Sequence, residues 1–170
     1  MSAELFRTVI DSLEFARTGQ TLRGTVPVPG LTRLRDSLYD DAGQVDFEVR
    51  GGHDGRHRPM LNLEVKGLLH LKCQRCLESL DFPLRIGGTL LLLANPPEVA
   101  GDELDTQETD WIEPDSALDI ASLVEDEIIL ALPYAPRHPE GRCSTERSGA
   151  APRGAQAPFA QLAALRRTRN

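Results

Sequence analysis

Aromatic residues and cysteines are scarce in this chain: of its 170 residues, 5% are aromatic and three are cysteine. A small, odd number of cysteines argues against a disulfide scaffold, because a domain of this length buries enough apolar surface to fold without one. Long apolar runs are absent as well, and the first residues show neither the basic nor the apolar region of a signal peptide. We therefore expect a cytoplasmic protein that does not enter a membrane.

Basic charge is in the minority, with 19 Lys and Arg against 26 Asp and Glu and a formal net charge of −7. The excess of acid is local, because residues 98–127 contain no Lys or Arg, whereas residues 137–170 are rich in Arg. This composition excludes a basic footprint for nucleic acid spread over the whole chain, but it allows a local basic patch or tail.

Motifs of the common catalytic sites are missing too. The sequence has no P-loop, no G-x-G-x-x-G, no G-x-S-x-G and no H-E-x-x-H. The carboxylates of residues 98–119 lie in a stretch with the composition of a solvated loop, which does not hold a metal ion rigidly enough for hydrolysis. We therefore expect no enzymatic activity.

Several segments alternate between apolar and polar residues, which is the period of half-buried strands. The expected strands are residues 21–28, 45–49 and the arms of a long hairpin, 61–72 and 77–86. Residues 90–93 either continue the second arm or start a further strand. The best helix begins at Ile120, after the capping-box spacing of Ser116 and Asp119, and ends before Pro133. Short helices are expected at residues 11–18 and 30–39. The predicted fold class is α+β, a mainly antiparallel sheet with a long CxxC-tipped hairpin, packed by one strong helix and shorter helices.

The distribution of Pro, Gly and Arg predicts how the chain is divided. Residues 1–135 are expected to form a single α+β domain that contains an acidic loop at residues 95–115. Residues 136–157 are expected to be a flexible segment rich in Pro, Gly and Arg. Residues 158–170 are expected to form a short basic helix or tail.

The sharpest local signal is the pair Cys73 and Cys76 at the turn of the long hairpin. A tight turn presents two thiolates to a tetrahedral ion, and His138 and Cys143 supply two further ligands after the strong helix. The sequence therefore predicts a zinc site formed by these four residues. Two other interpretations stay open: reduced thiols that merely occupy a turn, and a redox pair. A redox CxxC belongs at a helix N-terminus in a βαβ unit, whereas the flanks here alternate like strands.

Three charged residues are candidates for a role beside this site. Lys72 and Arg75 at the hairpin tip are predicted to contact an RNA phosphate backbone, the alternative being solvated charge on an exposed turn. Glu127 lies near the middle of the apolar stripe of the Ile120 helix. It is predicted to be a buried structural carboxylate paired with Arg75 or Lys72, the alternative being that it lies at the edge of the stripe and reaches water.

The segments CQRCLE, LVEDEIILALPYAPRHPEGRC and PFAQLAALRR follow one another in this order. Together they resemble the large ribosomal RNA subunit accumulation protein family, also called the YceD family, over nearly the whole chain. The resemblance implies a bacterial cytoplasmic protein with a role in synthesis, processing or stability of large-subunit (23S) ribosomal RNA. It also implies metal and nucleic-acid binding without an assigned enzymatic activity. Cys73, Cys76, His138 and Cys143 match the family's cysteines and histidine, whereas the Arg- and Ala-rich remainder of residues 141–156 matches no family motif.

Three functional hypotheses follow from these observations. The first is a non-catalytic ribosome biogenesis factor that binds large-subunit ribosomal RNA or a pre-ribosomal particle through Lys72, Arg75 and the Arg-rich tail. The second is an adaptor that binds a ribosomal protein or an assembly enzyme through the acidic stretch, without direct RNA contact. The third is an enzyme, either a thiol oxidoreductase or a nuclease. We expect the first, with recognition of RNA shape and backbone because aromatic residues are few.

Overall fold

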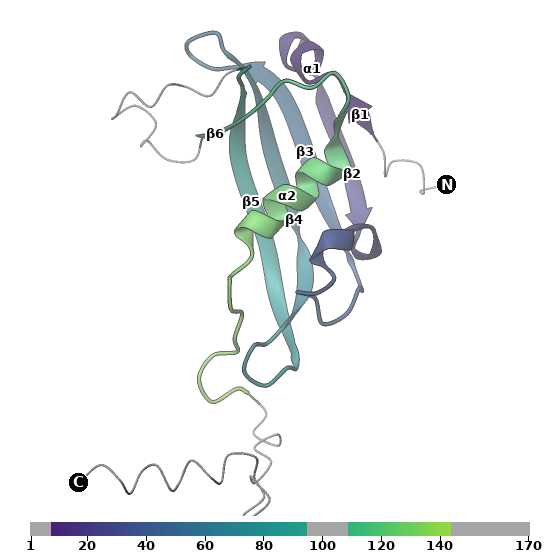
Figure 1. The fold of residues 1–170 in the computed structure, drawn as a ribbon, viewed down its shortest axis with the longest axis vertical. Helices are drawn as coiled ribbons and strands as arrows, with labels where there is room; N and C mark the ends of the chain where they lie inside the picture. The colour runs from purple at the N-terminus through teal and green to yellow at the C-terminus, as the bar shows by residue number, and fades with distance from the viewer. Residues whose placement is uncertain (1–7, 95–108, 144–170) are drawn as a thin grey trace, which may run out of the picture.

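A twisted five-stranded sheet is the body of the molecule (Figure 1). The computed structural model describes residues 8–94 and 109–143. The strands, in their order across the sheet, are β2 (Thr21–Pro27), β3 (Gln44–His53), β4 (Pro59–Lys72), β5 (Ser79–Leu92) and β6 (Thr109–Ile112). Neighbouring strands are antiparallel except for β5 and β6, which are parallel. The prediction of an α+β fold with a mainly antiparallel sheet is confirmed.

The long hairpin predicted from the alternating pattern is formed by β4 and β5. These strands pair over their whole length, from Met60 opposite Leu91 to Lys72 opposite Ser79. Because side chains alternate between the faces of a strand, one face of β4 is buried and the other is largely in contact with solvent. The hairpin extends beyond the rest of the sheet, and its turn carries the two cysteines to one end of the molecule (Figure 1).

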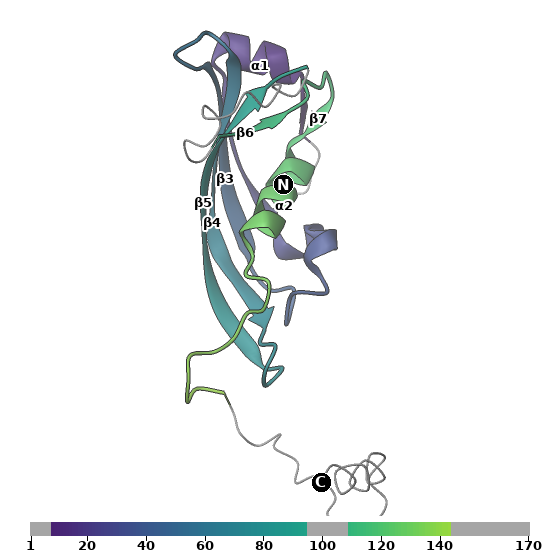
Figure 2. The same cartoon turned by 60° about the vertical axis from the view of Figure 1, so that its left-hand side comes forward.

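All helical elements lie on one side of the sheet, the concave side (Figure 2). Helix α1 (Ser12–Thr18) contacts β3 and β4, and helix α2 (Ile120–Ala131) contacts β5. Two 3₁₀ turns, η2 (Val28–Gly30) and η3 (Thr32–Leu34), lie on the same side, together with a small sheet of β1 (Val9–Ile10) and β7 (Leu118–Asp119). The core therefore fills the space between this layer and the inner face of the sheet.

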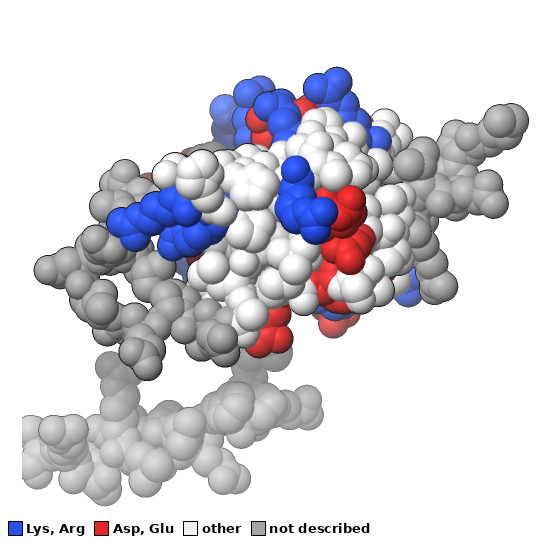
Figure 3. All heavy atoms as spheres, turned by 90° about the horizontal axis from the view of Figure 1, so that it is seen from above, with Lys and Arg blue, Asp and Glu red and all other residues white. Residues whose placement is uncertain are grey.

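The outer face of the sheet is covered by paired charges. Arg23 and Arg50 both bind the carboxylate of Glu48, and Lys66 binds Glu64. Hydrogen bonds from the two arginines lower the pKa of Glu48 to about 2. Seen from the α1 end, Lys and Arg side chains stand in separate groups, with acidic or uncharged residues between them (Figure 3).

The helix expected at residues 30–39 is replaced by 3₁₀ turns. Leu31 and Leu34 each donate a backbone N–H to the carbonyl three residues before, the spacing of a 3₁₀ turn. Pro27 and Pro29 lie at the start of this segment and cannot donate such bonds. The leucines that suggested a helix are nonetheless buried, because a spacing of three also places residues on one side of a 3₁₀ turn.

Two loops differ from their expected lengths. The loop between the strands expected at residues 45–49 and 61–72 is shorter than expected, because β3 runs to His53 and β4 begins at Pro59. Within the expected acidic loop 95–115, Thr109–Ile112 forms edge strand β6. The expected segment 136–157 is described only as far as residue 143, and segment 158–170 lies outside the described residues. No helix in the described ranges is long and apolar enough to cross a membrane.

Candidate metal centre

A tight turn at the end of the β4–β5 hairpin holds the first two cysteines. Leu77 donates its backbone N–H to the Cys73 carbonyl at 2.9 Å, and Cys73 donates its own to the Glu78 carbonyl at 3.0 Å. Leu77 adopts a left-handed conformation, with φ of 63°, that lets the chain turn back into β5. The turn therefore directs the side chains of Cys73 and Cys76 to one place.

The other two candidate ligands, one nitrogen and one sulfur, come from the chain after α2. We call residues 132–143 the strap, because they run from the end of α2 beside β5 to the hairpin tip (Figure 1). The strap is joined to the turn by a hydrogen bond of 2.8 Å from the Gln74 N–H to the Pro136 carbonyl. This contact brings His138 and Cys143 next to two cysteines more than sixty positions earlier in the chain.

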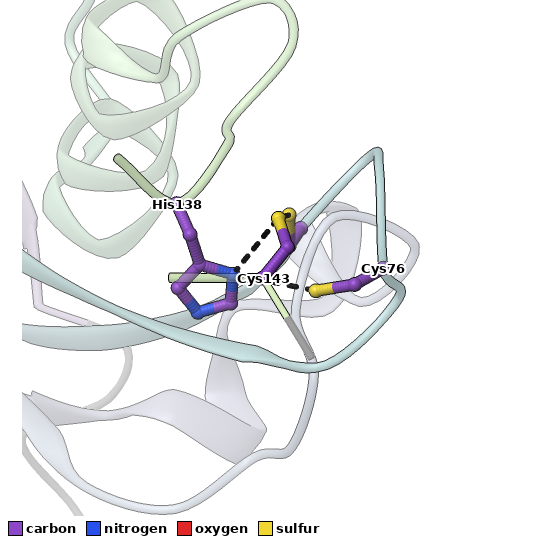
Figure 4. A group of neighbouring side chains, drawn as sticks. Cys76, His138 and Cys143 are labelled. Carbon is purple, nitrogen blue, oxygen red and sulfur yellow. Dashed lines mark hydrogen bonds between the residues drawn. The ribbon is translucent and has the colours of Figure 1, made fainter. Parts of the chain in front are cut away.

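The four candidate ligand atoms lie within 4.8 Å of one another. The Sγ atoms of Cys73 and Cys143 are 3.8 Å apart, and His138 Nδ1 lies 3.3 Å from Cys76 Sγ and 3.9 Å from Cys143 Sγ. In Figure 4 the labelled side chains point toward one another. A tetrahedral zinc ion with ordinary bond lengths needs about 3.8 Å between sulfurs and about 3.6 Å between sulfur and nitrogen. The cluster is thus close enough to hold a metal ion.

The electrostatic surroundings favour thiolate at one of the cysteines. Burial alone raises the pKa of the Cys73 thiol, but backbone N–H groups, including those of Cys76 and His138, point at its sulfur and bring its pKa down to about 5. Burial and the neighbouring thiols of Cys76 and Cys73 raise the pKa of Cys143. A buried group of three thiolates needs a cation, and a bound metal ion provides one.

The imidazole of His138 is already oriented for ligation. Its Nε2 lies 2.9 Å from the Ser79 carbonyl oxygen, so Nε2 carries the proton and donates it to this acceptor. Nδ1 is then left with a free lone pair that faces the sulfurs. Three thiolates and one imidazole suit zinc, and four protein ligands leave no open position for a substrate, which is the character of a structural metal site.

The other predicted site residues lie in different surroundings. Arg75 is exposed at the hairpin tip and Lys72 is half-buried beside it. Glu127 is half-buried on α2, and burial together with the nearby carboxylates of Asp110 and Asp126 raises its pKa. Within the described ranges Glu127 forms no ion pair with Arg75 or Lys72. The prediction of a buried, paired Glu127 is therefore wrong.

The buried carboxylate of α2 belongs to Glu125. Its oxygens accept hydrogen bonds from the backbone N–H of Arg33 at 2.7 Å and from Arg33 Nε at 2.9 Å. Glu127 is nearer the centre of the apolar stripe, but η3 covers the side of the helix that carries Glu125. The position of η3 is a tertiary feature that periodicity along α2 does not contain.

In the sequence Arg137 and Arg142 stand out only as members of the Arg-rich residues 137–170. The structure places them directly before His138 and Cys143 on the strap, at the same end of the molecule as Lys72 and Arg75. The signal was in the sequence, because each of the four candidate ligands is immediately preceded by Lys or Arg.

A family model described as "Large ribosomal RNA subunit accumulation protein YceD" matches residues 61–166, more than half of the chain. The chain belongs to the YceD family. The match begins in β4 and takes in the hairpin, α2 and all four candidate ligands of the metal centre. Membership confirms the family resemblance and implies a role in the accumulation of large-subunit ribosomal RNA. No solved structure matches this chain.

Proposed function

We propose that this YceD-family chain is a non-catalytic, cytoplasmic ribosome biogenesis factor that binds one zinc ion and contacts 23S ribosomal RNA or its pre-ribosomal particle. The observation that carries the proposal is the convergence of Cys73, Cys76, His138 and Cys143 within 4.8 Å. This convergence joins the strap to the hairpin tip, where Lys72 and Arg75 are available to phosphates.

Zinc is the metal that this set of ligands favours. Thiolates select soft or borderline ions, and three cysteines with one histidine form a set typical of structural zinc sites. Because the protein fills all four positions, the ion has no place for a reacting water or substrate. The absence of an open position supports a structural ion and a factor that binds without catalysis.

The metal is tested by elemental analysis of the purified, untagged protein. We expect about one zinc per chain, lost in the double variant Cys73→Ser/Cys76→Ser. The matched control is His57→Gln, which changes an exposed histidine in the β3–β4 loop and should keep the metal. Protein purified under reducing conditions without chelator that carries no metal would leave the cysteines with packing or redox roles and contradict the zinc proposal.

RNA contact is tested by binding of the zinc-loaded protein to a 23S ribosomal RNA fragment at increasing salt. Neutralising two phosphate contacts in Lys72→Gln/Arg75→Gln should weaken binding and reduce its dependence on salt. The control Arg85→Gln removes another exposed cation of the same hairpin, in the middle of β5, and should bind as the native protein does. Equal affinity of the native protein and the tip variant would contradict contact through the tip.

A second candidate function is an adaptor for a basic ribosomal protein or an assembly enzyme. It is favoured by the closeness of Asp110 and Asp126 to Glu127, whose pKa these carboxylates raise, because such a concentration of negative charge attracts a basic partner. Failure of the native protein to bind RNA, together with salt-sensitive binding of a basic ribosomal protein, would favour this function over the first.

A further inference from the structure

The strap is held in place although most of its side chains are exposed. It begins at Leu132, whose N–H bonds to the carbonyls of Ile128 and Ile129 at the end of α2, and it ends at the metal cluster. Between these points Pro136 is bonded to the hairpin turn. A segment fixed at both ends and interrupted by prolines loses little conformational entropy when it binds a ligand.

Four cations directly precede the four candidate ligands in the chain, so their backbone positions are held where the cluster forms. They are Lys72, Arg75, Arg137 and Arg142. In the part of the chain that the structure describes, none of these four pairs with a carboxylate. Elsewhere in the fold cations do pair with carboxylates, among them Arg17, Arg23, Arg33, Arg50, Arg58 and Lys66.

Tyr134 lies on the strap four residues before His138. Its relative exposure is 105%, so its ring is fully in water and contributes nothing to the core. Pro133 precedes it and restricts the backbone at that point. An exposed aromatic ring on a segment that also carries unpaired cations is a combination with which proteins bind unpaired bases of a single strand, because each base has a face for stacking.

We propose that the strap and the hairpin tip form one site for single-stranded RNA, with Tyr134 stacking on an unpaired base and Lys72, Arg75, Arg137 and Arg142 contacting phosphates. The proposal rests on the RNA-binding function proposed above and specifies the class of RNA. Duplex RNA does not offer a base face to Tyr134, so it gains only the phosphate contacts. The metal ion assembles the site, because it joins the two segments that carry the cations.

Glu78 and Glu140 oppose this charge. They belong to the hairpin turn and the strap, respectively, and their carboxylates repel phosphate. Acidic and basic residues of this surface should therefore affect RNA affinity in opposite directions. Removing one of the acids should strengthen RNA binding, whereas removing a neighbouring cation should weaken it.

The test measures fluorescence anisotropy of a labelled 12-nucleotide oligouridine and of a 12-base-pair RNA duplex, with zinc-loaded native protein and variants. Tyr134→Leu should weaken oligouridine binding about tenfold and leave duplex binding unchanged, while Tyr134→Phe should keep the native affinity. Arg137→Gln/Arg142→Gln should weaken both and reduce the salt slope for oligouridine by about 1.4. Glu140→Gln should strengthen both, and Arg85→Gln should change neither.

The zinc content of each variant is measured, so that weaker RNA binding is not mistaken for the effect of a lost metal centre. Native affinity of Tyr134→Leu for oligouridine, with binding lost in Lys72→Gln/Arg75→Gln, overturns the single-stranded site and leaves the proposed function standing. Failure of the native protein to bind either RNA overturns both. Weakened oligouridine binding that Tyr134→Phe does not restore also overturns stacking as its cause.

Discussion

Gly51 is where strand β3 passes directly against the backbone of helix α1. A Cβ at this position would lie 2.2 Å from the Phe15 carbonyl oxygen and 2.8 Å from Ala16 Cα. Backbone atoms cannot rotate aside as the end of a side chain can, so the helix would have to move. The absence of a side chain at Gly51 therefore sets the distance between α1 and the sheet.

Gly51→Ala should consequently destabilise the fold by about 1–3 kcal/mol, the usual cost of overpacking a core contact. Urea unfolding followed by circular dichroism measures the change. The matched control is the adjacent Gly52→Ala, whose added Cβ would meet its nearest neighbour, Met60 Cε, at 3.6 Å. Equal stability of the two variants would show that helix α1 can move away from the added Cβ without a loss in the free energy of unfolding.

Glu127 leads to a prediction on pH. Burial and the carboxylates of Asp110 and Asp126 raise its pKa in the folded protein above the ordinary value of 4.5. Ionising a carboxyl group is less favourable in the folded protein than in the unfolded chain when its folded pKa is raised. The free energy of unfolding therefore falls as pH rises from about 4.5 through the folded pKa. Glu127→Gln should therefore be more stable than the native protein at pH 7, with the difference disappearing below about pH 4.

The comparison variant is Glu125→Gln, which should be less stable at pH 7 by about 1 kcal/mol. It weakens charge-assisted hydrogen bonds to Arg33, whose side chain is 47% exposed and is therefore partly screened by solvent. Urea unfolding at pH 4 and pH 7 measures both variants. Loss of stability in Glu127→Gln at pH 7 would mean that Glu127 has a favourable partner in the folded protein.

At the level of elements, helix α2 shows where local sequence is decisive. It spans Ile120–Ala131, as predicted, and the side chain of Asp119 accepts a hydrogen bond from the Ala121 N–H at 2.9 Å. Asp119 is therefore the N-cap residue, and Ser116, the first residue of the predicted capping box, precedes β7. The helix begins where the sequence predicted. In a capping box the first residue, here Ser116, is the N-cap, but the structure gives that role to Asp119, the last residue of the motif.

Asp119→Ala should cost about 1 kcal/mol, because the half-buried N-cap acceptor is lost. Ser116→Ala should change stability by less than about 0.5 kcal/mol, since Ser116 is an exposed residue outside the helix. Thermal unfolding of both variants measures the difference. If Ser116→Ala were the more damaging, the cap assignment would be contradicted.

At the level of the whole molecule, the apolar core and the candidate metal cluster are two separate groups of buried side chains. The three cysteines form a buried group that is distinct from the core between the sheet and the helices. The sheet and α2 are thus supported by the core, whereas the strap depends on the cluster and a few hydrogen bonds. Loss of metal should release the strap before it unfolds the sheet.

Limited trypsin digestion of zinc-loaded and chelated protein tests this separation. Chelation should increase the rate of cleavage after Arg137 and Arg142 by about tenfold, because the strap opens locally. Cleavage after Arg85, within β5, should not change. The fragments are quantified by mass spectrometry. Simultaneous cleavage at Arg85 would instead show that the entire domain depends on the metal.

Sequence alone determined the long strands of the sheet and the residues of the candidate metal site. In β4 the period of two fixes which side chains share a face whatever packs on them, and Leu61, Leu63 and Val65, which share one face, are all buried. The cysteines and His138 indicated a candidate metal site because few other residue types supply such ligands. Strand and ligand assignments were possible because they depend on residue type and on local repeats.

Tertiary structure alone decided which distant segments of the chain contact one another. The hydrogen bond between Gln74 and Pro136 brings the strap to the hairpin tip, and no local pattern in either segment specifies that distance. In the same way, η3 buries Glu125 in preference to Glu127, although the helical period favours the latter. Contacts between distant segments depend on how the layers pack, and packing is a property of the whole chain.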